Sequence, residues 1–240
     1  RPAGRSAGFA GTSAGGAGGL RPAGDPPRMN PGAATSTRPG EAARPAPEGA
    51  RRSHALEHLT GALLRGDSMQ VLDLGGIGQQ TMDYVTGLGH RLYAEDLLRS
   101  AEEAFPGQDW DAGNLDERAV EHFLERAIPF ANGTVTAVLA WDQFHYLPPS
   151  LAEAVVRRLH RVMRPDGLML ALFHPESAGP QAALCTCRII DAQHLLVRPR
   201  GTSRRTRKFT PRTIERFLHE FSSVKFFMTR ESVQEVIARR

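Results

Sequence analysis

The sequence has 240 residues, of which 40% are hydrophobic and 23% are charged, so it can form a sizeable core. Its formal net charge is only +4, and three of these charges lie in residues 1–50, so the remainder lacks the basic excess typical of nucleic-acid-binding proteins. Two cysteines exclude a disulfide framework, and no apolar run approaches the roughly 18 residues that span a bilayer. We therefore predict a soluble, cytoplasmic protein without a membrane segment.

Residues 1–50 differ in composition from the rest of the chain. They hold 11 of the 24 glycines and 8 of the 17 prolines, with few large apolar side chains. Such a segment cannot bury enough apolar surface to offset the entropy lost on ordering. We predict a disordered Gly/Ala/Pro/Arg-rich arm over residues 1–50 and one folded domain over residues 51–240.

Strands alternate with helices from residue 51 onward. Ser53 is expected to cap the first helix, in which Leu56, Leu59 and Leu63 share a face. In chain order the first half is predicted to contain a helix ending near residue 66, a strand over 69–74, a helix over 79–86, a strand over 91–94, and helices over 97–105 and 116–127.

The second half continues the pattern and then changes. Residues 135–141 and 168–173 are predicted to be buried strands because they are apolar almost throughout. Alternating strands and helices favour an α/β fold with a mostly parallel sheet covered on both faces. The other predicted elements are a helix capped by Ser150 and ended by residues 165–167, a hairpin of 187–190 with 194–197, a helix beginning at Thr210-Pro211, and closing strands over 224–228 and 233–238, the last of which could be helical.

The most informative segment is residues 71–78, with the sequence VLDLGGIG. A buried strand that runs into glycines and then a helix brings backbone N–H groups toward a ligand. The spacing lacks the third glycine of a nicotinamide site, and the sequence has no P-loop motif. Asp73, just before the glycines, suits a ligand with positive charge or amine donors. The alternative is a tight turn without a ligand.

Five segments, taken in chain order, resemble the motifs of class I S-adenosylmethionine-dependent methyltransferases. The resemblance runs from about residue 54 to the C-terminus. The resemblance implies a doubly wound, Rossmann-like methyltransferase fold with antiparallel closing strands, and S-adenosylmethionine as cofactor. The segments are VLDLG at 71–75, YAEDL at 93–97, Asp111-Ala112 followed by Leu115, AVLAWDQFHYL at 137–147 and RVMRPDG at 161–167.

The resemblance also implies which residues bind the cofactor. An acid at the end of the second strand would hold the ribose hydroxyls. Glu95 and Asp96 are adjacent, so their side chains diverge, and the register favours Asp96. The alternative is that either acid only caps the following helix. The predicted cofactor-binding residues are Asp73, Gly75, Gly76, Gly78, Asp96, Asp111, Ala112 and Trp141.

The glycine segment departs from the family pattern G-x-G-x-G. In that register Gly75 is followed by Ile77 and Gln79, while Gly76 and Gly78 fall between them. A β-branched residue adopts positive φ only at a cost. Either the turn uses Gly76 and Gly78, or cofactor binding is weakened and the chain is a catalytically silent binding or scaffold protein.

His145 is the predicted general base, because it follows the fourth-strand motif and an imidazole titrates near neutral pH. Asp142 is predicted to orient it, although His145 could instead only shape the pocket. We expect a small-molecule acceptor, whose methylated atom and identity the sequence does not give. No metal site is predicted: His54 and His58 lack a third ligand, and Cys185 and Cys187 lack a second pair.

A basic run raises the third possibility, a nucleic-acid methyltransferase. Apart from Phe209 at its end, no aromatic residue lies within it, so a solvated loop is favoured. The oligomeric state is not predicted. The run consists of Arg198, Arg200, Arg204, Arg205, Arg207 and Lys208.

Overall fold

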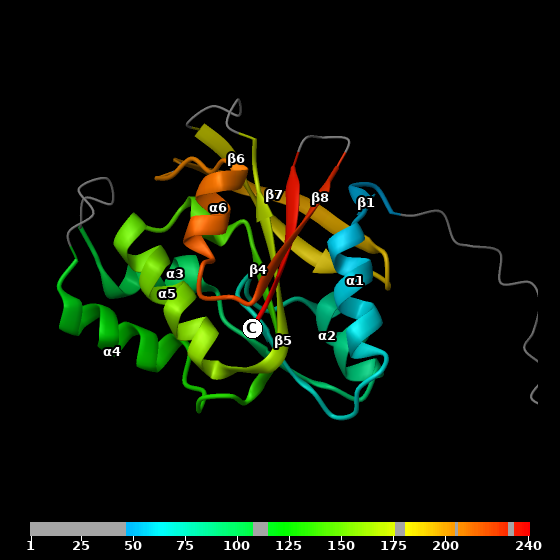
Figure 1. The fold of residues 1–240 in the computed structure, drawn as a ribbon. Helices are drawn as coiled ribbons and strands as arrows, with labels where there is room; N and C mark the ends of the chain where they lie inside the picture. The colour runs from blue at the N-terminus through cyan, green and yellow to red at the C-terminus, as the bar shows by residue number, and fades with distance from the viewer. Residues whose placement is uncertain (1–46, 108–114, 176–180, 205, 230–232) are drawn as a thin grey trace, which may run out of the picture. The chain divides into compact units, whose positions relative to one another are not determined.

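The computed structural model describes residues 47–107, 115–175, 181–204, 206–229 and 233–240, and Figure 1 shows their fold. The arm predicted over residues 1–50 lies almost wholly outside these ranges. Its predicted boundary falls within a short strand, β1 (Ala50–Arg52). In the described part of the chain, no helix has the length and apolar character needed to cross a membrane.

A six-stranded sheet forms the centre of the domain, in the order β3-β2-β4-β5-β9-β8. The first four strands are parallel to one another, whereas β9 is antiparallel to both of its neighbours. This arrangement confirms the predicted fold and shows that the last strand is not helical. The strands are β2 (Gln70–Asp73), β3 (Arg91–Ala94), β4 (Val135–Trp141), β5 (Met163–Phe173), β8 (Ser223–Met228) and β9 (Gln234–Arg239).

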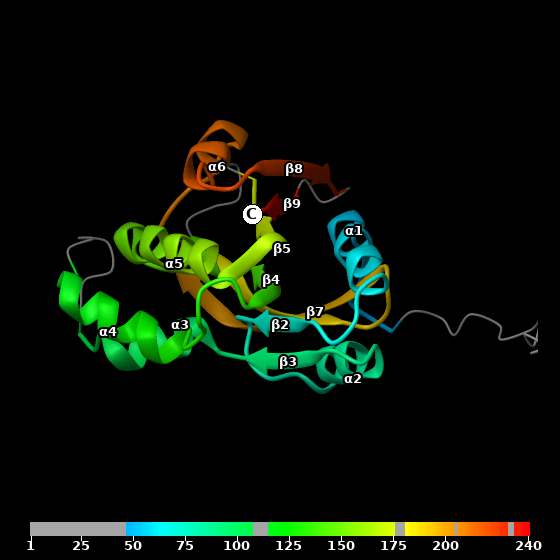
Figure 2. The same cartoon turned by 60° about the horizontal axis from the view of Figure 1, so that its bottom comes forward.

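Helices cover both faces of this sheet (Figure 2). One face packs against α1 (His54–Leu63) and α2 (Gln79–Gly87), and the buried leucines of α1 join the core on that side. The opposite face carries a larger core formed with the other four helices. They are α3 (Leu97–Ala104), α4 (Glu117–Ala127), α5 (Pro149–Val162) and α6 (Pro211–Phe217).

A second, three-stranded sheet has the order β1-β7-β6. The predicted hairpin is confirmed, but its strands β6 (Gln181–Ile189) and β7 (His194–Arg204) are longer than expected. Strand β1 was not predicted, because three residues of ordinary polarity carry no periodic signal. Its pairing with β7, such as Ala50 opposite Leu196, depends on a partner far along the chain.

Helix α1 is tied to the last strand at its first turn. Ser53 Oγ accepts from the Leu56 N–H at 3.0 Å, which confirms the predicted cap. The same hydroxyl donates to Glu235 Oε2 at 2.9 Å, and the Ala55 N–H reaches that oxygen at 3.0 Å. The buried carboxylate of Glu235 on β9 therefore completes the first turn of a helix whose cap residue lies 182 positions earlier.

The prediction that Ser150 caps α5 is wrong. The helix begins at Pro149 with Pro148 at the cap position and no side-chain cap bond. Proline fits the first helical position because its φ is already helical and its missing N–H would have no partner there. The helix also ends earlier than residues 165–167 suggested, since β5 begins at Met163 and Asp166 takes a left-handed φ of 64°.

Candidate functional site

The strand order has a switch point at β2, and we call the region outside the carboxyl ends of β2, β3, β4 and β5 the crevice. From β2 the chain passes to β3 on one side and later to β4 on the other side. At such a switch point, ligands bind outside the carboxyl ends of the strands. Polar side chains gather there: Asp73 ends β2, Asp96 follows β3, Asp142 follows β4 and His174 follows β5.

The glycine turn between β2 and α2 uses Gly76 for its left-handed position, whereas Gly78 is extended, with φ of −150°. Gly76 takes the left-handed conformation, with φ of +76°, and its N–H donates to the Glu95 carbonyl at 3.0 Å. A Cβ on Gly75 would lie 2.6 Å from Trp141 Cδ1, so that position requires glycine. The side chain of Ile77 is 80% exposed and does not fill the turn.

Asp73 is fully buried beneath this turn. Its Oδ1 accepts from Trp141 Nε1 at 2.6 Å and from the Gly75 N–H at 2.9 Å, whereas Oδ2 has no hydrogen-bond partner among the described residues. Desolvation raises the pKa of Asp73 to about 6, although both hydrogen bonds act in the opposite direction. The carboxylate therefore organises the turn and leaves one buried oxygen unused.

The adjacent acids Glu95 and Asp96 diverge, as their spacing requires. Glu95 accepts from the Ser100 hydroxyl. Asp96 caps α3 through the Arg99 N–H at 3.4 Å and pairs with Arg200, whose Nη1 lies 2.8 Å from Oδ2. Partial burial raises the pKa of Asp96, but the hydrogen bond and charge of Arg200 outweigh it, so the pKa is lowered overall. Asp96 stays ionised at the edge of the crevice.

Two arginines of the β6–β7 hairpin reach across the crevice, and sequence reasoning gave neither this role. Arg188 on β6 donates to the Gly75 carbonyl at 3.2 Å and to the Ile77 carbonyl at 3.0 Å. The Arg188 side chain occupies the space that a Cβ on Gly78 would need, since its Nε lies 1.9 Å from the position of that Cβ. Arg200 on β7 holds Asp96, so the hairpin contacts both the glycine turn and the neighbouring acid.

The basic run at 198–208 is partly used in contacts within the domain. Besides the Arg200–Asp96 pair, Arg207 pairs with Glu153 at 3.1 Å and lies over the rings of Phe209 and Phe217. Arg198 and Lys208 are exposed. The side chains of Arg204 and Arg205 lie outside the described part of the chain.

His145 is buried, and both of its ring nitrogens have partners. Nε2 accepts from the His174 backbone N–H at 3.0 Å, and Nδ1 lies 3.2 Å from the Arg207 carbonyl, so Nδ1 carries the proton. The carboxylate of Asp142 holds a different imidazole, because its Oδ2 lies 3.0 Å from His174 Nε2. His174 was missed in the sequence, although its position directly after a predicted strand was a usable signal.

Local strain and unsatisfied groups mark the end of β4. Trp141 adopts a φ of 51°, which is costly for a bulky residue. Asp142 Oδ1 and Gln143 Oε1 are buried without hydrogen-bond partners among the described residues. Strained backbone and unpaired buried polar groups concentrate at functional sites, where a ligand completes them.

Other predicted residues lie elsewhere. Asp111 and Ala112, predicted to contact the adenine, fall outside the described residues. Among the described residues, no group of three or more His, Cys, Asp or Glu side chains could hold a metal. His54 lies 3.6 Å from Glu57 on the same helix, and Cys185 and Cys187 carry free thiols.

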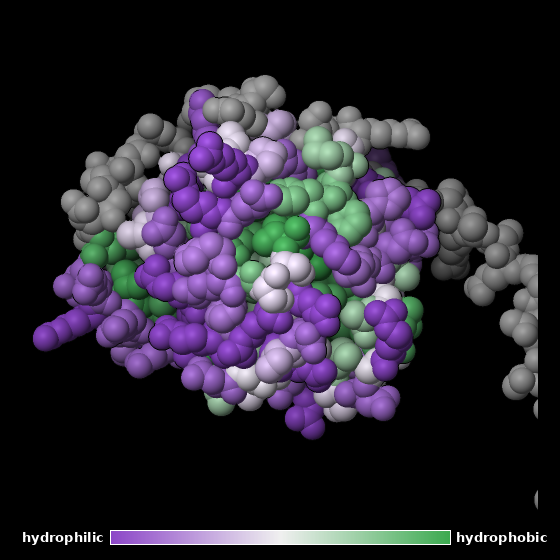
Figure 3. Space-filling model, in the orientation of Figure 1, coloured by the Kyte–Doolittle hydropathy of each residue, from purple (hydrophilic) through white to green (hydrophobic). Residues whose placement is uncertain are grey.

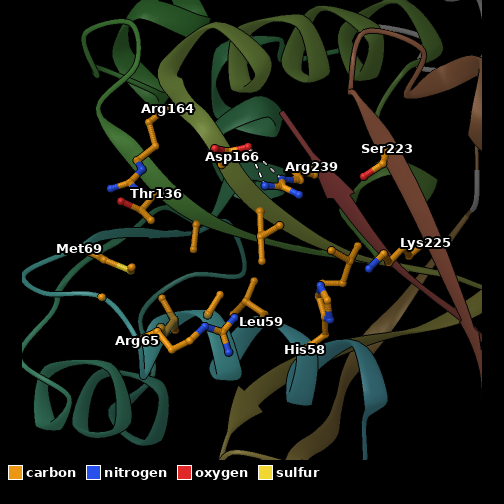
Figure 4. A pocket seen from close by; sticks show the side chains of 16 residues that line it. His58, Leu59, Arg65, Met69, Thr136, Arg164, Asp166, Ser223, Lys225 and Arg239 are labelled. Carbon is orange, nitrogen blue, oxygen red and sulfur yellow. Dashed lines mark hydrogen bonds and ion pairs between the residues drawn. The ribbon is translucent and has the colours of Figure 1, made fainter.

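A cavity of about 490 Å³ lies at the opposite end of the sheet, between α1 and the amino ends of β4 and β5 (Figure 4). Its floor is apolar and its rim carries exposed cations, among them Arg65, Arg164 and Lys225. Figure 3 shows hydrophobic surface bordered by hydrophilic residues in this region. Partial burial and three nearby cations lower the pKa of His58 at its edge. None of the crevice residues described above lines this cavity.

Residues 72–171 match the family described as methyltransferase domain. The comparison with curated proteins gives no match. Similar solved structures include 1,6-didemethyltoxoflavin-N1-methyltransferase from Burkholderia thailandensis with bound 1,6-didemethyltoxoflavin and S-adenosylhomocysteine, at 18% identity over 78% of this chain and 76% of that one, with a TM-score of 0.41. An S-adenosylmethionine-dependent methyltransferase from Mesorhizobium loti is 16% identical over 78% of this chain and 98% of that one, with a TM-score of 0.42.

Proposed function

Because residues 72–171 match the methyltransferase-domain family, we propose that the chain is a class I S-adenosylmethionine-dependent methyltransferase and that it methylates a small-molecule acceptor bound at the carboxyl ends of β4 and β5. S-Adenosylmethionine supplies an electrophilic methyl group on a sulfonium sulfur. The protein supplies binding, orientation and exclusion of water, which are the main requirements of an in-line transfer.

The residues present fit this cofactor. Gly75, Gly76 and Gly78 are buried in the turn, and a Cβ on Gly76 would lie 3.2 Å from the Cβ of Asp96, so glycine there lets the turn approach the predicted ribose ligand closely. The ionised carboxylate of Asp96 would accept hydrogen bonds from the two ribose hydroxyls. The buried Oδ2 of Asp73 offers an acceptor that the described residues leave unused. The roles predicted for Asp111 and Ala112 at the adenine stay predictions.

The observation that supports a small acceptor is the position of the β6–β7 hairpin. Arg188 and Arg200 connect the hairpin to the glycine turn and to Asp96, so part of the crevice lies beneath it. A compact molecule can enter such a site more readily than a folded nucleic acid. The nucleic-acid alternative is weakened further because Arg200 and Arg207 are engaged in ion pairs within the domain.

The assignment of Asp96 is tested by calorimetric titration of the full chain with S-adenosylmethionine and S-adenosylhomocysteine. We expect Asp96→Ala to weaken binding by about 1–3 kcal/mol, because a charged hydrogen-bond partner of the ribose is lost. Glu95→Ala is the matched control: the side chain of the neighbouring acid turns toward Ser100, so its removal should leave affinity unchanged. Equal affinities for the wild type and the Asp96 variant would contradict the assignment.

A further inference from the structure

A buried carboxylate and a partly exposed imidazole meet at the carboxyl ends of β4 and β5. Asp142 is 2% exposed, and its Oδ2 lies 3.0 Å from His174 Nε2. The Tyr146 hydroxyl lies 3.4 Å from the same oxygen and 3.3 Å from the Ala183 carbonyl. The His174 side chain is 22% exposed, so the ring extends from the buried acid toward the crevice.

This contact fixes the protonation pattern of His174. An ionised carboxylate accepts hydrogen bonds, so the proton of the neutral ring resides on Nε2. Nδ1 then carries the lone pair, and it has no hydrogen-bond partner among the residues that the structure describes. The backbone N–H of His174 donates to His145 Nε2 at 3.0 Å, which fixes the start of the segment after β5. His145, with both nitrogens engaged, therefore serves as a support for its neighbour.

The groups around the pair belong to the crevice that contains Asp96. Burial and the negative charge of Asp142 raise the pKa of Cys185 on β6. Arg200 on β7 is hydrogen-bonded to Asp96, and the charge of Asp142 contributes to its raised pKa as well. The strands that precede the two acids, β3 and β4, both pair with β2, so Asp96 and the Asp142–His174 pair lie at the same edge of the sheet.

We propose that Asp142 and His174 form a general-base dyad, and that the acceptor is a weakly acidic hydroxyl of the phenol class. The proposal rests on the proposed function. A carboxylic acid is already ionised at neutral pH and needs no base, whereas a phenol, with a pKa of about 10, does. A histidine whose other ring nitrogen is held by a carboxylate can remove such a proton as the methyl group is transferred.

The step is balanced. The phenol oxygen forms a bond to the methyl carbon while the bond from that carbon to the sulfonium sulfur breaks, and its electron pair stays on sulfur. The hydroxyl proton moves to His174 Nδ1, and the resulting imidazolium is stabilised by the carboxylate of Asp142. The partly exposed ring then releases the proton to water. S-Adenosylhomocysteine and the methyl ether are the products.

The first test determines which ring nitrogen of His174 carries the proton, and it needs no acceptor. Long-range proton–nitrogen NMR of the protein with ¹⁵N-labelled histidine reports which ring nitrogen carries the proton. We expect His174, assigned by the loss of its signals in His174→Gln, to be protonated on Nε2. Asp142→Asn should change this tautomer, as it does when a carboxylate partner of a catalytic histidine becomes an amide. A His174 protonated on Nδ1 in the wild type would overturn the proposal.

The second test measures S-adenosylhomocysteine release with a series of para-substituted phenols, from 4-methoxyphenol to 4-nitrophenol. We expect His174→Gln to slow methylation of 4-methoxyphenol about 100-fold or more. The loss should shrink along the series and nearly vanish for 4-nitrophenol, which ionises most readily. A merely structural role would reduce all rates alike.

The matched control is His160→Gln, because His160 on α5 also lies beside a carboxylate, that of Glu220 at 3.6 Å, but outside the crevice. We expect wild-type rates from this variant. The melting-temperature shift with S-adenosylhomocysteine shows whether each variant is folded and binds the cofactor product. Intact binding without turnover of any phenol, or equal losses across the series, would overturn the dyad. Absent binding in the wild type would instead contradict the proposed function.

Discussion

The two ends of the six-stranded sheet carry charged side chains in opposite environments. At the carboxyl ends, Asp73 and Asp142 are buried, and each has an oxygen without a partner among the described residues. At the amino ends, Arg65, Arg164 and Lys225 surround a cavity but are exposed to water. Burying an ionised group costs several kcal/mol, whereas an exposed cation costs almost nothing.

A hollow by itself does not locate a functional site. The cavity at the amino ends has a volume of about 490 Å³, yet the groups around it are in environments that need no compensation. The carboxyl ends combine buried acids with the positive φ of Trp141, and such features persist only where the surrounding structure holds them. The destabilising groups thus mark the crevice to which we assign the chemistry.

The largest effect should come from Asp73. Because its pKa is about 6 in the folded protein and about 3.8 when unfolded, the folded state binds more protons between these values. Stability should therefore fall as the pH rises from about 4 to 6, by about 3 kcal/mol in total. Denaturant titrations across this range should show that the fall is absent in Asp73→Asn. Parallel pH profiles for the two proteins would contradict the buried-acid interpretation.

A smaller loss is expected when the turn beside that acid is overfilled. Gly75→Ala places a Cβ 2.6 Å from the buried ring of Trp141, so we expect the free energy of unfolding to fall by about 1–3 kcal/mol. Gly87→Ala is the matched control, since no atom lies within 4 Å of the added carbon at the end of α2. A control variant as unstable as Gly75→Ala would show that the close approach does not matter.

The smallest effects on stability should distinguish the two ends of the six-stranded sheet directly. Arg200→Gln removes a partly buried ion pair with Asp96 and should cost up to about 1 kcal/mol, less at high salt. Arg239→Gln removes an exposed pair with Asp166 at the other end and should change stability by less than about 0.5 kcal/mol. Chemical denaturation at low and high salt measures both. Equal losses of stability in the two variants would contradict the expected difference between the two ends of the sheet.

The sequence predicted the parts of the fold that local patterns determine. Buried strands such as 135–141 are apolar throughout, and the cap at Ser53 combines a suitable side chain with a following apolar face. Strand β1 and the length of the hairpin depend on pairing between distant segments, which no local period reveals. The same limit explains why the run that contains Arg200 was assigned to a solvated loop and why Arg188 was given no role.

The site was predicted in part. The acids Asp73 and Asp96 lie in the crevice because the carboxyl ends of parallel strands meet at one edge. The partner of Asp142 was sought nearby in sequence, at His145, whereas the sheet brings His174 from the end of the adjacent strand. Because β4 and β5 are adjacent, the residues that follow every predicted strand are candidate partners of Asp142, and His174 is among them. The roles of His145, Asp142 and Trp141 toward ligands stay predictions.

The bond between Ser53 and Glu235 has a consequence for biosynthesis. Helix α1 emerges from the ribosome among the first described elements, but the acid that completes its first turn belongs to β9. That strand also fills the gap between β5 and β8. A nascent chain can therefore form its early helices and strands, but the sheet closes only after translation has passed residue 235. Until then, β5 presents an unpaired strand edge on the side that β9 later covers.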